Sequence, residues 1–279
     1  MGRTATTSTR IQAFRDSFVR SRPDQLVTEE PLEIRVHGPG QEPRAVAVTM
    51  RTPGADFDLA VGHLLSEGIL ADLEALASVA YCQAGAAQQD YNVVTVRLRA
   101  PVHLGERTVT TMPASCGVCG KTRREEVTAA VRIPDGGPLV TMESLVGMPD
   151  TLRAAQPLFT RTGGIHAAAR FTAAGELLAV REDIGRHNAL DKLIGDAVRS
   201  GVLPLHDQVV LISGRVSFEI VQKAAMAGVP IVAAVSAPSS LAVETADSIG
   251  QTVVGFVREG GGNIYAHPER IAGSAAGVA

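Results

Sequence analysis

Residues 209–235, VVLISGRVSFEIVQKAAMAGVPIVAAV, decide the fold of this chain. The short apolar run at 209–212 is typical of a strand that is covered on both faces. A polar turn at 213–217 then leads into a helical pattern at 218–227, and a second apolar strand follows at 231–235. Strand, helix and strand in this order predict a layered α/β sheet with right-handed crossovers.

The same alternation extends to both sides of this stretch. We expect a helix at 241–249 and a strand at 252–257 downstream, and a helix at 188–199 upstream, preceded by a hairpin of 170–171 and 177–180. The N-terminal half has alternating strands at 31–36 and 44–48, a helix at 59–67 that ends at Gly68, and a strand at 92–98. The predicted fold class is α/β: an α+β N-terminal domain followed by a layered α/β domain.

Three segments are predicted from composition and pattern. Residues 1–22 are polar and aperiodic, which indicates a disordered tail. Residues 23–137 form the N-terminal α+β domain, which ends in a cysteine loop and a helix at 122–131. Residues 138–279 form the second domain, and Asp135-Gly136-Gly137-Pro138 is the predicted linker.

Composition excludes several classes of protein. The net charge is −3, whereas a nucleic-acid-binding protein needs a basic face. No apolar run approaches the ~20 residues that cross a bilayer, and residues 1–22 lack the apolar core of a secretory signal. The three cysteines do not resemble a disulfide framework and fit a reducing compartment, so the predicted location is cytoplasmic.

The cysteines suggest the chemistry. Cys116-Gly117-Val118-Cys119 can grip a metal, cycle as a dithiol, or present one reactive sulfur beside a second thiol. A structural zinc site usually needs a second close pair of ligands, which the chain lacks, so we expect no zinc. Cys82 stands alone near the end of an expected apolar helix and is interpreted as an inert thiol.

The flanks of the cysteine loop favour a reactive sulfur. No tryptophan precedes Cys116, unlike a thioredoxin-like site, and Gly117 and Gly120 give the loop mobility. Lys121 and the neighbouring arginines would stabilise a thiolate or a persulfide anion at Cys116. The flanks therefore favour a reactive thiolate at Cys116, with Cys119 as the second thiol of the loop.

Polar turns recur at strand and helix ends in the second half. They lie at 160–166, where two glycines enter an expected small-residue helix, and at 181–188, 213–217, 236–240 and 256–263. Each alone is most often a helix cap. Together, with arginines in several of them, they indicate a phosphate-bearing ligand, because α/β folds bind anions at such ends.

Several of these motifs, in this order, resemble the formate dehydrogenase accessory sulfurtransferase family, FdhD. The matching stretches are CGVCGK at 116–121, TGGIH at 162–166, EDIGRHN at 182–188 with Asp191-Lys192, SGR at 213–215 and FVR at 256–258. The resemblance implies that Cys116 receives persulfide sulfur from a cysteine desulfurase. It implies transfer of that sulfur to a bis(molybdopterin guanine dinucleotide) molybdenum cofactor, as bound substrate, before the cofactor enters formate dehydrogenase. The implied cofactor-contacting residues are Phe256, Val257, Arg258, Glu259, Gly260 and Gly261.

The resemblance also implies a homodimer and a C-terminal domain with the three-layer fold of cytidine deaminases. Those enzymes use H-x-E and a later P-C-x-x-C around zinc. Here Ala168 replaces the glutamate after His166, and the Cys-x-x-Cys lies before that histidine, so we reject deaminase activity. A non-catalytic chaperone that only holds the cofactor remains the alternative. No nucleic acid and no membrane is expected as a partner.

Overall fold

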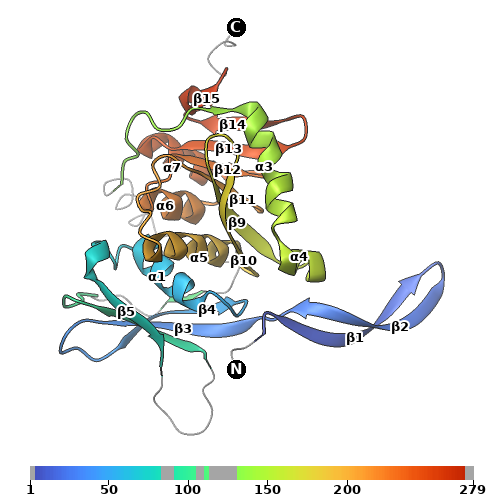
Figure 1. Ribbon diagram of the computed structural model, residues 1–279, viewed down its shortest axis with the longest axis horizontal. Helices are drawn as coiled ribbons and strands as arrows, with labels where there is room; N and C mark the ends of the chain where they lie inside the picture. Colours follow the sequence, from blue (N-terminus) through green and yellow to red (C-terminus); the bar gives the residue numbers. More distant parts are fainter. Residues whose placement is uncertain (1–3, 83–90, 105–109, 113–130, 274–279) are drawn as a thin grey trace.

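The computed structural model describes residues 4–82, 91–104, 110–112 and 131–273. Within these ranges the chain forms four β-sheets, of two, six, two and five strands. The six-stranded sheet with its helices lies beside the five-stranded sheet, and a two-stranded hairpin projects from one end (Figure 1). The mixed α/β class predicted from the sequence is confirmed. Among the described residues, no helix is long and apolar enough to cross a membrane.

The larger sheet is built on three parallel strands, β11 (Val209–Ile212), β12 (Ile231–Ala234) and β13 (Thr252–Arg258). Beside β11 lie β9 (His166–Phe171) and then β10 (Leu177–Asp183), and beside β13 lies β14 (Gly261–Ala266). Each of these three outer strands is antiparallel to its inner neighbour. The strands predicted at 209–212, 231–235 and 252–257 are confirmed to within one residue.

Helices cover both faces of this sheet. Val210 and Ile212 point into one core with α5 (Arg186–Arg199), α6 (Phe218–Met226) and α7 (Ser240–Ile249). Val209 and Leu211 point into the opposite core with α3 (Met142–Ala154), which the short α4 (Pro157–Thr162) follows. Alternate side chains of β11 thus enter two different apolar cores. Because both faces of the strand are buried, every residue of it is apolar, which explains the continuous apolar run in the sequence.

β9 corrects one prediction. The alanines after His166 were expected in a helix, yet Ala167, Ala168 and Ala169 are fully buried in a strand between β10 and β11. Alanine favours a helix locally, but here small side chains let both helical layers approach the sheet. Tertiary packing overrides the local preference.

The N-terminal sheet contains β3 (Glu30–His37), β4 (Arg44–Arg51), β6 (Val93–Leu98) and β7 (Thr110–Met112). The edge strand β5 (Leu76–Tyr81) follows a 3₁₀ turn, η1 (Leu73–Ala75), and pairs antiparallel with β6. The helix expected before Cys82 is therefore wrong, because this segment takes the edge position of the sheet. Leu32, Ile34 and Val36 pack against α1 (Asp56–Ser66), as the alternating pattern predicted.

The predicted disordered tail is also corrected. β1 (Thr6–Arg15) and β2 (Phe18–Val27) form an antiparallel hairpin that stands out from the body as an arm (Figure 1). Asp16 and Ser17, at the tip, both have positive φ angles, 49° and 67°, as a two-residue hairpin turn requires. The polar composition hid the strands, because the side chains of a two-stranded arm have no core to face.

The predicted linker at 135–138 lies against the C-terminal sheet. The buried Arg270, in a 3₁₀ turn (η2, Pro268–Arg270), donates to the carbonyl oxygens of Gly136 at 2.6 Å and Pro134 at 3.0 Å. After the linker, β8 (Val140–Thr141) pairs with β15 (Ile271–Ala272). The domain boundary at residue 137 stays a prediction.

α1 and α5 join the two halves at very short range. A Cβ atom added to Gly62 would lie 1.9 Å from the carbonyl oxygen of Asp191, and one added to Gly195 would lie 1.8 Å from that of Asp58. Only glycine permits this approach of the two backbones.

Candidate functional site

The polar turns of the C-terminal half meet at one edge of the large sheet. Because β11, β12 and β13 are parallel, their carboxyl ends lie on the same side. Asp183, at the end of β10, pairs with His166, which begins the antiparallel β9. The backbone N–H of Phe256 donates to the carbonyl of Ser236 at 3.2 Å, which links the last two turns. Ligands of α/β proteins bind at this edge.

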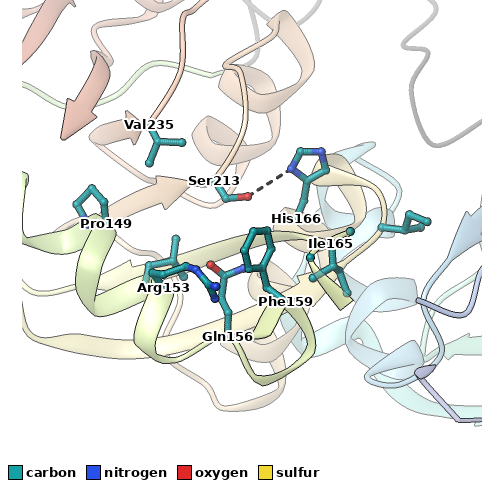
Figure 2. Close-up of a pocket in the computed structure, with 12 residues that line it drawn as sticks. Pro149, Arg153, Gln156, Phe159, Ile165, His166, Ser213 and Val235 are labelled. Carbon is teal, nitrogen blue, oxygen red and sulfur yellow. Dashed lines mark hydrogen bonds between the residues drawn. The ribbon is translucent and has the colours of Figure 1, made fainter. Parts of the chain in front are cut away.

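A cavity of about 460 Å³ opens at this edge between the sheet and the α3–α4 corner. Its walls are largely apolar and come from Pro149, Leu152, Phe159, Ile165, Ile184 and Val235. Figure 2 shows Gln156, Phe159 and Arg153 on one side of the cavity, with Ser213 and His166 on the other. The volume is within the range typical of small-molecule sites.

Gln156 is the unusual residue of this cavity. It is 4% exposed, and its Nε2 has no hydrogen-bond partner among the described residues. Beside it, the guanidinium of Arg153 lies 4.0 Å from the centre of the Phe159 ring. A buried amide without a partner costs folding free energy unless something pairs with it. The sequence analysis missed all three residues, because no motif marks them.

His166 and Ser213 form the opposite wall. The Ser213 hydroxyl accepts a hydrogen bond from the backbone N–H of Ala167 at 2.8 Å and lies 3.4 Å from Nδ1 of His166. Burial, and then the charge of Arg186, lower the pKa of His166 below its ordinary value. The imidazole is therefore neutral near pH 7 and can serve as a hydrogen-bonding group.

Two arginines lie next to this wall. Arg186 begins α5 and Arg215 precedes α6, and the carboxylate of Glu219 acts electrostatically on Arg186. Nε of Arg186 is buried without a partner, and burial together with the charge of Arg215 lowers the pKa of Arg186. A Cβ atom on Gly214 would lie 3.3 Å from the His166 ring, so glycine keeps this space open. Two adjacent cations at helix starts favour an anion.

His187 follows Arg186 in the chain and adds no positive charge to the two arginines. Its Nε2 lies 3.0 Å from the Ser217 hydroxyl. Burial, and then the charges of Arg186 and Lys223, lower the pKa of His187 to about 4. The histidine is neutral near pH 7.

The implied cofactor residues share one surface. Phe256, Arg258, Glu259, Gly260 and Gly261 line an open hollow of about 530 Å³ at the turn between β13 and β14, together with Gly262 and Asn263. Val257 is buried below it. Phe256 has a φ of 55°, and the strand pairing is irregular between Gly255 and Arg258. A Cβ atom on Gly260 or Gly261 would meet nothing within 4 Å, so the backbone there is open to a ligand.

The dense polar run at 181–192 has a different role from the one expected. The carboxylate of Asp183 accepts from the backbone N–H of Thr52 at 3.1 Å and lies 2.7 Å from Nζ of Lys192. Asn188 donates to the carbonyl of Met50 at 2.8 Å. Most of the run therefore fixes the N-terminal sheet to the C-terminal one, and Arg186 and His187 remain at the ligand edge.

A second buried ion pair of the C-terminal half lies at the same junction. Nζ of Lys223 lies 2.8 Å from the carboxylate of Asp191, which also accepts from the Ser66 hydroxyl at 2.8 Å. Burial by itself raises the pKa of Asp191, but Lys223 and His63 outweigh it and hold that pKa at about 2.

Cys116 and Cys119 lie outside the described residues, as does almost all of the helix expected at 122–131. Cys82 is a half-buried free thiol whose backbone N–H donates to the carbonyl of Val93 at 2.9 Å. Within the described ranges, no three His, Cys, Asp or Glu side chains gather as metal ligands would.

The matches to known proteins cover nearly the whole chain. The model of the FdhD/NarQ family matches residues 27–272. The chain is 52% identical to the sulfur carrier protein FdhD of Streptomyces avermitilis, over 98% of this chain and 97% of the relative. It is 48% identical to the protein of the same name from Mycobacterium tuberculosis, over 96% and 99%.

A solved structure has the same fold. The crystal structure of a protein of Desulfotalea psychrophila, described as a candidate formate dehydrogenase accessory protein, superposes with a TM-score of 0.74 at 20% identity. The match covers 96% of this chain and 99% of that one.

Proposed function

The chain belongs to the FdhD/NarQ family, and from this membership we propose that it is a sulfur carrier of formate dehydrogenase maturation. Cys116 accepts sulfur from a cysteine desulfurase and transfers it to a bis(molybdopterin guanine dinucleotide) molybdenum cofactor, the substrate, before the cofactor enters formate dehydrogenase. The observation that carries the proposal is about 50% identity to sulfur carrier proteins along nearly the whole chain.

The loading step is a thiol exchange. The thiolate of Cys116 attacks the outer sulfur of the desulfurase persulfide, the S–S bond of that persulfide breaks, and the desulfurase cysteine leaves as a thiolate. Lys121 and the arginines that follow it favour the anionic forms of both thiol and persulfide. Cys119, the second thiol of the loop, assists or protects the transfer.

The cofactor would bind along the carboxyl edge of the large sheet. Residues 256–261 offer an open backbone and the guanidinium of Arg258 to a nucleotide tail. Arg186, whose Nε is buried without a hydrogen-bond partner, and the adjacent Arg215 offer two cations. Phosphates bind well to such helix starts and arginine forks.

The protein acts in the cytoplasm as a homodimer with a deaminase-like C-terminal domain. The arm supports self-association, because an isolated two-stranded hairpin is marginally stable in water. Phe14 and Phe18, near its tip, are 72% and 67% exposed. Sedimentation analysis should give a dimer, and deletion of residues 4–27 should shift it toward monomer.

Intact-mass analysis separates the carrier from a non-catalytic chaperone. After incubation with a cysteine desulfurase and cysteine, the protein should gain the mass of a sulfur atom, and reductant should remove it. Cys116→Ala should abolish the gain, and Cys82→Ala should keep it. A protein that binds the cofactor but never gains sulfur would be the chaperone.

A further inference from the structure

The N-terminal arm has two faces of different character. In an antiparallel hairpin, residues that lie opposite each other in the two strands point to the same face. One face, which we call the arginine face, is made of three cross-strand pairs: Arg15 with Phe18, Ala13 with Arg20, and Ile11 with Arg22. The opposite face carries Phe14 with Val19 and Gln12 with Ser21, and it is uncharged over this stretch.

The arginine face is open and short of carboxylates. A hollow of about 450 Å³ lies on it, lined by Ala13, Arg15, Asp16, Phe18, Arg20 and Arg22. Among the residues that the structure describes, Arg15 and Arg20 make no ion pair, and Arg22 has only an exposed one with Asp24 at 3.4 Å. Arginine and phenylalanine are enriched where proteins bind proteins. The composition of this face is therefore that of a protein contact.

Charge defines the partner. The segment 4–27 contains four arginines and two aspartates, whereas the whole chain has a net charge of −3, so the chain outside the arm is acidic. An extended polyanion such as a nucleic acid or an anionic membrane would be repelled by that acidic body. A carboxylate-rich segment of another protein can match the arm alone, because charge complementarity between proteins is local.

A second copy of this chain suits the opposite face better. A two-fold dimer places the same surface patch of both copies together. The arginine face would then meet its own guanidinium groups, whereas the face with Phe14 and Val19 would bury apolar side chains. The arginine face is thus left for a different protein.

The root of the arm lies beside the proposed substrate site. β2 contacts α4, and Figure 1 shows α4 next to the place where the arm leaves the body. The carboxylate of Glu182, at the end of β10, accepts from the backbone N–H groups of Leu158 and Phe159 at 3.1 and 2.9 Å. Phe159 lines the cavity at the carboxyl edge of the large sheet. A protein held by the arm would therefore lie near the rim of this edge.

We propose that the arginine face docks a carboxylate-rich segment of the client formate dehydrogenase, with Phe18 as the apolar anchor. The guanidinium groups of Arg15, Arg20 and Arg22 pair with the carboxylates of that segment. Docked there, the client lies beside the edge from which it would receive its cofactor. This inference rests on the proposed function, which supplies the client.

Charge reversal tests the arginines. Biolayer interferometry measures binding of the full-length protein to cofactor-free formate dehydrogenase from the same organism, at low and at physiological ionic strength. Arg20→Glu should weaken binding about tenfold, mainly through a slower association rate, and should reduce the salt dependence. Arg10→Glu is the matched control, because Arg10 is opposite Pro23 on the other face of the same arm. It should bind the client as the wild type does.

The two phenylalanines of the arm test the anchor. Phe14 and Phe18 are 72% and 67% exposed, so neither change to alanine should unfold the protein. Phe18→Ala should weaken client binding about tenfold, as the loss of an interface anchor does, and should leave the dimer intact in sedimentation analysis. Phe14→Ala should keep the client affinity and shift the dimer toward monomer.

Three results would overturn the inference: client affinity unchanged in both Arg20→Glu and Phe18→Ala, equal losses in Arg20→Glu and Arg10→Glu, or a dimer lost in Arg20→Glu. The last result would assign the arginine face to the second copy. Intact mass separates the inference from the proposed function. A wild-type protein that gains sulfur but does not bind the client would overturn only the docking face. One that binds the client through this face but never gains sulfur would overturn only the carrier function.

Discussion

Nζ of Lys192 lies 2.7 Å from the carboxylate of Asp183, and both side chains are almost completely buried where the two sheets meet. The same ammonium group donates to the carbonyl of Thr52 at 2.8 Å, while Asp183 accepts from the backbone N–H of Thr52. Two residues of the C-terminal half thus bind both polar groups of one peptide segment in the N-terminal half. The ion pair therefore fixes the position of the N-terminal half against the C-terminal half.

Breaking this pair should destabilise the whole chain. Lys192→Met leaves a buried carboxylate without its cation and should cost about 3–5 kcal/mol of unfolding free energy. The double variant with Asp183→Asn should lose less than the sum of the two single changes. Urea denaturation measures these values. Arg22→Ala, which removes an exposed ion pair with Asp24, should change stability by no more than about 1 kcal/mol. A Lys192→Met protein as stable as wild type would contradict the role of the pair.

The three cysteines should differ in their effect on the client enzyme. Cys116→Ala should leave the carrier folded and yield formate dehydrogenase with no activity, because the sulfur has no acceptor. Cys82→Ala should support nearly full activity, since this half-buried thiol lies beside a strand of the N-terminal sheet. Formate oxidation in cells that contain each variant is the measurement. Full activity with Cys116→Ala would remove that residue from the relay.

Arg258 should bind a nucleotide tail without taking part in sulfur loading. Arg258→Ala should weaken GDP binding by about 1.5–3 kcal/mol, as expected for a charged hydrogen bond. Sulfur loading of Cys116 should be unchanged. Calorimetry with GDP tests the first half, and intact mass tests the second. Arg161→Ala, an exposed arginine near the end of α4, is the control and should bind as wild type. Equal binding by both variants would place the nucleotide elsewhere.

His187 should make stability depend on pH. Its folded pKa, about 4, is below the ordinary 6.5, so the unfolded chain binds the proton more readily. The contribution is therefore fully present above pH 6.5 and is lost as the pH falls toward 4, by up to about 3 kcal/mol. Urea denaturation at pH 7 and pH 5 should show the loss, and His187→Gln should reduce it. An unchanged pH dependence in that variant would assign the effect to other groups.

The sequence by itself determined the alternation of strands and helices from 209 to 257. Continuous apolar runs and helical periods are local signals, and here packing agrees with them. It also marked the glycine-rich turn at 256–261, because open backbone is a property of residue type, whereas the role of the cysteine loop stays a prediction. It placed the polar turns at strand and helix ends, and the parallel pairing of β11, β12 and β13 then brings their turns to one sheet edge.

Only the tertiary structure decided the conformation of those segments whose local preference is weak or misleading. Ala167–Ala169 form a strand because layers on both faces need small side chains, and residues 76–81 form one because an edge of the N-terminal sheet was free to pair. Asp183 and Lys192 look like ligand-binding residues in the sequence, yet they face Thr52, more than a hundred positions away. Gln156 has no neighbours in the sequence that mark it. Its unpartnered amide exists only once α3, α4 and the sheet have closed around it, because burial is a property of the folded chain and not of the residue.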